Sequence, residues 1–278
     1  MPRFFRALTL LLPALAFGGV AASAFAGVVA MPPPGPARIA GADVVVVGKV
    51  EAIEPQDVKV GNTMYRIAVV KIKDGVRGIK DEKTLRIGFV PLEKPNPKIF
   101  VSGGRPVQLE AGQEGLFLLK KHDKENFYTI PGIVGYFVNS DKNTGFDKEV
   151  QAARAAAKVV ADPQAGLKSK DASERLLAAA ILIDRYRTFR GPKAKLEPID
   201  EKESKLILKT LADADWQAAF NFTSLQPHAG QLFQRLGVTA KDGFTVVAGA
   251  NYQAAAQQWV RDNAEKYRIQ RYVASDGK

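Results

Sequence analysis

The N-terminal half of the chain has a hydrophobic pattern with a period of two, which is typical of β-strands. Between about residues 42 and 136, apolar residues alternate with polar ones or form short continuous runs, and turn residues separate these segments. The pattern predicts strands at Asp43–Ile53, Met64–Lys73, Thr84–Val90, Gly115–Lys121, Phe127–Ile130 and Ile133–Val138. Such a series, with hardly a helical stretch between its members, indicates a small antiparallel barrel or sandwich.

Four consecutive valines, Val44–Val47, lie near the start of the first predicted strand. Such a run could begin a nucleotide-binding βαβ unit, but only a lone glycine, Gly48, follows it, and the strand-like pattern continues. The glycine-rich turn and the helix of a dinucleotide site are both missing. We therefore expect the valines to be buried on both faces of a barrel strand, with Gly48 inside the strand where it bends.

After Thr144 the apolar spacing changes to three or four and alanine becomes frequent, which indicates helices. Helices are predicted at about Asp147–Ala161, Lys170–Arg187, Glu201–Ala212 and His228–Leu236, and a last amphipathic one after Asn251. The expected N-caps are Ser169, Asp200 and Asn251, and Gly237 is the expected C-cap of the fourth helix. The second and third helices resemble a HEAT-type hairpin, although a solenoid needs more repeats than this one pair.

The N-terminus has the pattern of a signal peptide. Arg3 and Arg6 precede an apolar stretch, and Ala24-Phe25-Ala26 places small residues where a signal peptidase cleaves. We expect residues 1–26 to be removed and the mature protein to be exported, periplasmic or secreted, without a transmembrane segment. Residues 27–41 are rich in proline and glycine, and we expect them to form an extended leader.

These patterns divide the mature chain into residues 42–140 and residues 145–278. The predicted fold class is α+β, with an N-terminal antiparallel OB-like β-barrel followed by an all-helical C-terminal domain.

The composition restricts the chemistry. The chain has no cysteine, which excludes disulfides, thiolate metal sites and cysteine nucleophiles. Loss of the signal peptide would lower the formal charge from +11 to +9, a balance compatible with an acidic polymer as partner. The candidate polyanion-binding residues cluster in one predicted hairpin; they are Lys59, Arg66, Lys71, Lys73, Arg77, Lys80 and Lys83. Tyr65 is the only aromatic residue of that hairpin, so the stacking side chains of a single-strand-binding surface are missing.

No catalytic constellation stands out. His122 and His228 are far apart in sequence and lack partners nearby, so they are expected on the surface or in loops rather than as metal ligands. Ser102 lies in a long loop, Pro91–Pro106, without the motif of a serine hydrolase. We predict no cofactor, no nucleotide and no metal site.

Acidic and polar motifs add little. Glu110 and Glu114 flank a predicted turn and are interpreted as solvated charges. A glycosidase-type carboxylate pair elsewhere in the chain is not excluded by the sequence, because the two acids of such a pair can be far apart along it. Asn221 begins a glycosylation sequon, which matters only in a glycosylating pathway.

Taken together, the segments "ADVVVVGKVEAI", "MYRIAVVKIKDGVRGIKDEKTLRIGFV", "LEAGQEGLFLLKK" and "NFYTIPG" resemble the netrin-like, or tissue-inhibitor-of-metalloproteinase-like, OB-fold domains. Asp43, Gly48, Gly75–Gly78 and Gly112–Leu119 match the positions of that pattern, over about residues 42–135. The resemblance implies an exported OB-fold barrel. Inhibitors of that group chelate the protease zinc through an N-terminal cysteine, which this chain lacks, so that activity is not implied here.

The sequence therefore favours a non-catalytic binding or scaffold protein, with an OB-like barrel and a helical domain that binds a partner, either a protein or an envelope polymer. Two alternatives remain open. One is a hydrolase of cell-envelope polymer with a carboxylate pair between the two domains. The other is a polyanion-binding protein that uses the basic hairpin.

Overall fold

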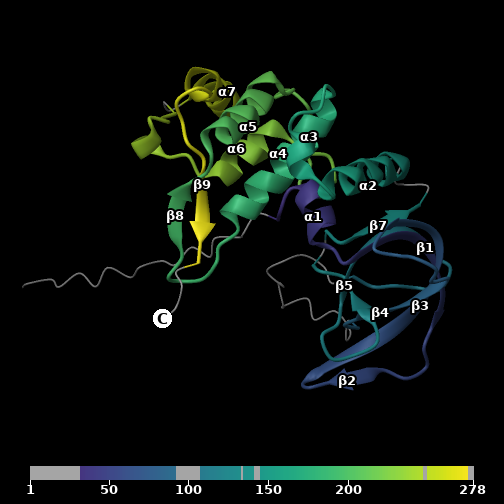
Figure 1. The fold of residues 1–278 in the computed structure, drawn as a ribbon. Helices are drawn as coiled ribbons and strands as arrows, with labels where there is room; N and C mark the ends of the chain where they lie inside the picture. The colour runs from purple at the N-terminus through teal and green to yellow at the C-terminus, as the bar shows by residue number, and fades with distance from the viewer. Residues whose placement is uncertain (1–31, 92–106, 133, 141–144, 247–248, 275–278) are drawn as a thin grey trace, which may run out of the picture. The chain divides into compact units, whose positions relative to one another are not determined.

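The computed structural model describes residues 32–91, 107–132, 134–140, 145–246 and 249–274. These residues form an α+β fold, with a large sheet in the N-terminal half and helices mostly in the C-terminal half (Figure 1). The predicted signal peptide, Ser102 and most of the predicted loop Pro91–Pro106 lie outside the described residues. Within the described parts of the chain, every helix is too short or too polar to cross a bilayer.

The main sheet contains seven strands. They are β1 (Val44–Ile53), β2 (Val58–Val60), β3 (Thr63–Arg77), β4 (Thr84–Phe89), β5 (Glu114–Lys121), β6 (Tyr128–Thr129) and β7 (Tyr136–Asn139). A separate two-stranded sheet pairs β8 (Lys195–Pro198) with β9 (Gln270–Val273). The helices are α1 (Gly35–Gly41), α2 (Phe146–Val160), α3 (Pro163–Gly166), α4 (Ala172–Arg187), α5 (Glu201–Asp213), α6 (Ala229–Leu236) and α7 (Tyr252–Asn263), with a 3₁₀ turn η1 (Ala240–Asp242).

The strand pairing of the main sheet corrects two features of the predicted barrel. Strand β1 pairs with β3 on one side and with β5 on the other, and β3 continues to β4. Strand β4 then pairs in parallel, not antiparallel, with β6, and β6 pairs with β5 through only two residues. The strands form one continuous sheet. This sheet is not closed as a barrel, because β6 spans only Tyr128–Thr129.

The four valines of β1 are buried on both faces of the strand, as predicted. Val44 and Val46 pack inside the sheet, against residues such as Phe117. Val45 and Val47 face the other way and join the core of the helices. This alternation explains a continuous apolar run in a strand, because both faces of β1 have an apolar layer to contact.

Gly48 lies inside β1, as predicted, at a point where the register against β3 shifts. A Cβ atom at this position would lie 2.6 Å from Val70 Cγ1 and 2.8 Å from the Lys71 carbonyl oxygen. The absence of a side chain therefore allows β3 to cross β1 closely.

Helix α4 is the centre of the helical part. Its residues Leu177–Ile183 are all buried, and α1, α2, α3, α5 and α6 contact it. A helix that is apolar all round has to be surrounded by neighbours, and the small side chains of Ala178–Ala180 let those neighbours approach closely. The core around α4 also includes Leu116 and Leu118 of β5, so the sheet and the helices share one apolar core.

The prediction of an extended leader is wrong for residues 35–41, which form helix α1 against α2 and α4. Pro36 suits the first turn of a helix because its fixed φ is helical and its missing N–H group would be unpaired there anyway. Ile39 is fully buried in the shared core. Folded structure therefore begins before Ala42.

The helix caps are mostly confirmed. Asp200 accepts a hydrogen bond from Glu203 N at 3.0 Å, Asn251 caps α7, and Gly237 ends α6 with a φ of 67°. Helix α4 is capped by Asp171 and not by the predicted Ser169. The C-terminal half is not all-helical either, because β8 and β9 pair there.

Candidate functional site

The seven predicted polyanion-binding residues lie on the β2–β3 hairpin and in the turn that follows it. Lys59 is on β2, Arg66, Lys71, Lys73 and Arg77 are on β3, and Lys80 and Lys83 follow in the turn to β4. Three of them have carboxylate partners: Arg66 contacts Asp57 at 3.1 Å, Lys71 contacts Glu51 at 3.6 Å and Lys73 contacts Glu114 at 2.5 Å.

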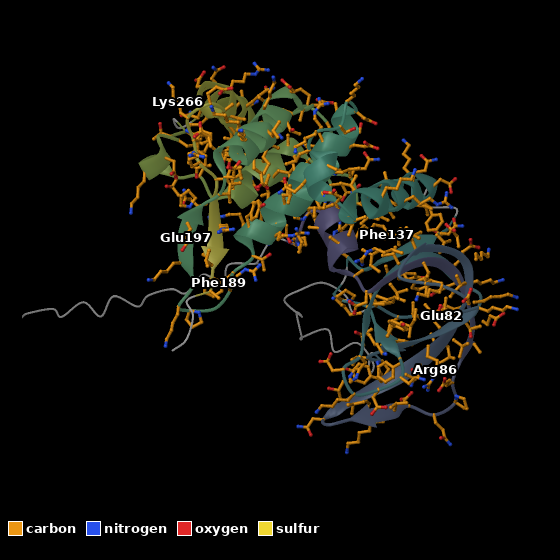
Figure 2. All side chains as sticks on the ribbon, viewed as in Figure 1. Glu82, Arg86, Phe137, Phe189, Glu197 and Lys266 are labelled. Atoms are coloured by element: carbon orange, nitrogen blue, oxygen red, sulfur yellow. The ribbon has the colours of Figure 1, made fainter. Side chains whose placement is uncertain are left out.

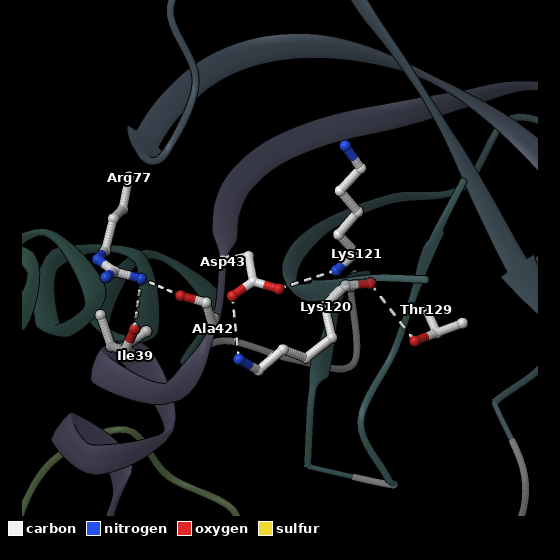
Figure 3. Close-up of polar contacts among 7 residues, drawn as sticks. All are labelled: Ile39, Ala42, Asp43, Arg77, Lys120, Lys121 and Thr129. Atoms are coloured by element: carbon white, nitrogen blue, oxygen red, sulfur yellow. Dashed lines mark hydrogen bonds and ion pairs between the residues drawn. The ribbon is translucent and has the colours of Figure 1, made fainter. Parts of the chain in front are cut away.

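Arg77 has a structural role. Its guanidinium donates hydrogen bonds to the carbonyl oxygens of Ile39 and Ala42, at the C-terminal end of α1 (Figure 3). Lys59, Lys80 and Lys83 have no ion pair with any residue that the structure describes. The basic hairpin thus presents less free charge than its sequence indicates, since local acids neutralise part of it.

Asp43 fixes the start of β1. Its N–H donates to the Leu119 carbonyl oxygen at 2.8 Å. Its carboxylate accepts from Lys121 N at 2.9 Å and from Lys120 Nζ at 3.0 Å (Figure 3). Burial alone would raise the pKa of this carboxyl, but the Lys121 N–H and the charge of Lys120 lower it below its ordinary value. Asp43 is therefore held as an anion that joins β1 to β5.

Next to Asp43, the ends of β3, β4, β5 and β6 surround an open pocket of about 730 Å³, which we call the sheet pocket. Its lining residues are Asp43, Tyr65, Gly88, Phe89, Val90, Val107, Lys120, Lys121, His122, Asp123, Thr129, Ile130 and Gly132. The volume of this pocket lies within the range of small-molecule sites in proteins, and its wall is mixed, with charged and polar side chains beside apolar ones.

Two rings, those of Tyr65 and His122, line one wall of the sheet pocket, and the buried ring of Phe127 supports them. The Tyr65 ring lies edge-on to His122, with centroids 5.5 Å apart, and Phe127 packs beneath both at 5.2 Å and 4.8 Å. Gly88 makes this possible, because a Cβ atom there would lie 2.5 Å from the Phe127 ring. The buried Phe127 thereby holds the half-buried rings of Tyr65 and His122 in place.

The two ring nitrogens of His122 have different surroundings. Nδ1 accepts a hydrogen bond from Lys124 N at 3.2 Å, whereas Nε2 has no hydrogen bond to any described residue. His122 Nε2, the Tyr65 hydroxyl and the Thr129 side chain are therefore hydrogen-bonding groups at the pocket. They lie next to an apolar surface that is formed by Phe89, Val90 and Ile130. The arrangement can bind a ring that has one apolar face and polar edges.

The second histidine is structural. His228 caps α6, since its Nδ1 accepts from Gly230 N at 3.2 Å and its Nε2 lies 3.0 Å from the Ala218 carbonyl oxygen. In the part of the chain that the structure describes, no group of three or more His, Cys, Asp or Glu residues is placed to hold a metal ion.

Several acids that a hydrolase could use are already bonded. Glu114 pairs with Lys73, and Asp74 pairs with Arg154 at 2.7 Å. Glu149 on α2 accepts from Ser224 Oγ at 2.8 Å and from Leu225 N at 2.6 Å. These carboxylates connect elements of the fold to one another.

The neighbourhood of Glu149 also contains a buried cation that the sequence pattern missed. Arg38 on α1 donates to the carbonyl oxygens of Val134 and Thr223, at 2.9 and 3.0 Å. Burial lowers the pKa of Arg38 to about 10, although the charge of Glu149 acts to raise it. Its buried charge is thus compensated by carbonyl groups from distant parts of the chain.

Sequence reasoning also missed the sheet pocket, because Tyr65, His122 and Phe127 come from three different segments. A search of protein-family models and a search of curated proteins both find no match to this chain.

Proposed function

We propose that the protein is an exported, non-catalytic binding module whose sheet pocket binds a sugar-ring segment of a cell-envelope polymer, with the helical part as a scaffold for a partner. The observation that carries this proposal is the pocket wall formed by Tyr65 and His122 on the rigid support of Phe127. Sugar rings have apolar faces and hydroxyl edges, and both can be matched by such a wall.

The strand order supports an OB-like interpretation of the sheet. Strand β1 lies between β3 and β5, and the parallel contact of β4 with β6 brings the chain after β5 next to β4. OB-folds bind oligonucleotides and oligosaccharides on this part of the sheet and on its neighbouring loops. His122, at the start of the β5–β6 connection, and Tyr65 on β3 occupy such positions.

Sugar is favoured over nucleic acid because of the charges around the pocket. Lys120 is paired with Asp43, and Asp123 also lines the pocket. The lining therefore has acids as well as cations, whereas a surface for a polyphosphate chain would have an excess of free cations.

Binding without cleavage is favoured because Asp43, one of the two acids that line the pocket, is committed to the fold. A glycosidase needs one carboxyl protonated as general acid and a second one across the bond. Asp43 has a lowered pKa and two donors on its carboxylate, which is the opposite of a proton donor at neutral pH.

The proposal is tested by thermal-shift and calorimetric titration with acidic and neutral oligosaccharides from envelope polymers. We expect the wild type to be stabilised by one class of them, and His122→Ala to weaken binding at least about tenfold, because one polar contact and one wall of the pocket are lost. Val90→Trp would fill the rim of the pocket at a half-exposed position and should also abolish binding while the fold is retained.

Lys59→Ala is the matched control, since Lys59 is an exposed sheet residue outside the pocket. Equal binding by wild type and by both pocket variants would rule the sheet pocket out as the binding site. Cleavage of an oligosaccharide that is lost in Asp123→Asn would instead support the alternative of an envelope-polymer hydrolase.

A further inference from the structure

The C-terminal end of α4 leads into a segment that carries positive charge only. Between Asp184 and Glu197 the chain has five cations and no acid. Arg185, Arg190, Lys193 and Lys195 form no ion pair with any described residue. This differs from the basic hairpin of β3, where acids neutralise several of the cations.

The fifth cation holds the segment in place. Arg187 donates from NH1 to the Gln270 carbonyl oxygen at 3.3 Å, and its guanidinium carbon lies 5.1 Å from the centroid of the Tyr272 ring. Arg187 also lies in the last turn of α4, where a cation balances the partial negative charge of the helix end. The remaining cations are not needed for these contacts.

Two large apolar side chains are exposed among the free cations. Phe189 is 63% exposed and Leu196 is 49% exposed. They share one face, because Leu196 lies directly opposite Tyr272 in the β8–β9 ladder and the Phe189 ring contacts Tyr272 edge-on at 5.6 Å. Figure 2 labels Phe189 near the β8–β9 sheet. We call Arg185, Phe189, Arg190, Lys193 and Leu196 the β8–β9 surface.

A pocket of about 430 Å³ adjoins this surface. Arg185, Arg190 and Arg271 line it together with Tyr186 and Tyr272. Arg271 also pairs with Glu197 at 3.9 Å, whereas Arg185 and Arg190 have no ion pair with a described residue. Guanidinium groups bind phosphate oxygens through two parallel hydrogen bonds, so Arg185 and Arg190 at one hollow suit a phosphate group.

We propose that the β8–β9 surface docks on an anionic lipid bilayer, with Phe189 and Leu196 entering the interface and the arginine pocket receiving a lipid phosphate. Exposed apolar side chains surrounded by Lys and Arg are the features by which proteins attach to such membranes. A nucleic acid would account for the cations and for stacking on Phe189, but it gives the aliphatic Leu196 no partner. A lipid surface accounts for all three features.

The test is sedimentation of the full chain with vesicles of phosphatidylcholine alone or of phosphatidylcholine mixed with phosphatidylglycerol. We expect binding to the mixed vesicles that falls as salt is added, because the lipid attraction is screened. Lys193→Gln should weaken binding about fivefold, the contribution of one cation near an anionic surface.

Phe189→Ala should weaken binding at every salt concentration. Phe220→Ala is the matched control, since Phe220 is 47% exposed and residues 213–224 contain no Lys or Arg. All variants keep the same N-terminal apolar sequence, so that sequence does not itself distinguish one variant from another.

A probe in the surface gives a second readout. Trp216 and Trp259 are buried, so Phe189→Trp adds an exposed indole whose emission should shift to shorter wavelength on mixed vesicles, while Phe220→Trp should not shift. Three results would overturn the proposal: no binding to mixed vesicles, binding that Phe189→Ala leaves unchanged, or retention on single-stranded DNA but not on vesicles.

Discussion

Gly78 and Asp43 show how closely the chain after β3 approaches the residues that join α1 to β1. Gly78 has a φ of 76°, and a Cβ atom there would lie 2.0 Å from the Asp43 carbonyl oxygen. Gly61 also has a positive φ, 58°, but a Cβ atom there would meet nothing within 4 Å. A side chain at Gly61 would therefore cost only the strain of the backbone conformation, whereas a side chain at Gly78 would add the cost of a close contact.

Replacement of these glycines by alanine should give unequal losses of stability. Gly61→Ala should lower the free energy of unfolding by about 1 kcal/mol, the strain of a left-handed residue with a side chain. Gly78→Ala adds an overpacked contact and should cost about 3 kcal/mol or more. Urea denaturation measures the loss of unfolding free energy in both variants. Equal losses would mean that the backbone at Asp43 moves away from the new side chain at little energetic cost.

Tyr136 provides a prediction on alkaline pH. Burial raises its pKa from 10.0 to about 12, and the charge of Glu110 acts in the same direction. A raised pKa means that the unfolded chain loses this proton first, so the stabilisation is complete below pH 10 and is lost as the pH rises toward 12. Tyr136→Phe keeps the ring that stacks on Phe117 and should lose less stability than wild type over that range. Parallel pH curves for the two proteins would contradict this assignment.

At the scale of elements, the long strands and the caps were predictable from the sequence. The valines of β1 and the run Leu116–Leu119 of β5 are continuous apolar segments because each strand contacts an apolar layer on both of its faces. Asp200, Asn251 and Gly237 act through neighbours within a few residues, so local sequence is sufficient for them.

Elements that depend on distant partners were not predictable. Helix α1 looks like a proline-rich leader until α2 and α4 bury it. Strands β8 and β9 are four residues each and pair across more than sixty residues of chain, so neither has a local signal. The sheet pocket belongs to the same class, because its three rings meet only when β3, β5 and the residues before β6 come together.

The cap of α5 can be tested directly. Asp200→Ala removes the acceptor for Glu203 N and should lower the unfolding temperature, while Asp200→Asn keeps a side-chain acceptor and should lower it much less. Thermal unfolding of the three proteins at neutral pH measures the difference. Identical losses for Ala and Asn would show that the carboxylate charge, and not the hydrogen bond, matters.

At the scale of the whole molecule, the shared core makes the sheet and the helices interdependent. Leu118 of β5 is 1% exposed and belongs to the same apolar cluster as Trp216 and Trp259. The Arg154–Asp74 pair adds a polar contact between α2 and β3. The described residues belong to one compact unit.

Leu118→Ala should therefore destabilise the sheet and the helices together, by about 2–5 kcal/mol. We expect tryptophan fluorescence, which reports on the helical part, and far-UV circular dichroism to give one coincident transition in wild type and variant. Leu196→Ala, at an exposed position, is the control and should change stability by less than about 0.5 kcal/mol. Two separate transitions would show independent domains.

The most direct test of binding without cleavage at the sheet pocket is to measure both properties in one sample. Wild type and His122→Ala are incubated with the envelope oligosaccharide that gives the largest thermal shift, and the bound ligand is recovered and its mass determined. We expect wild type to retain an intact ligand and His122→Ala to retain much less of it. Recovery of cleaved ligand, or equal retention by the two proteins, would contradict binding without cleavage at the sheet pocket.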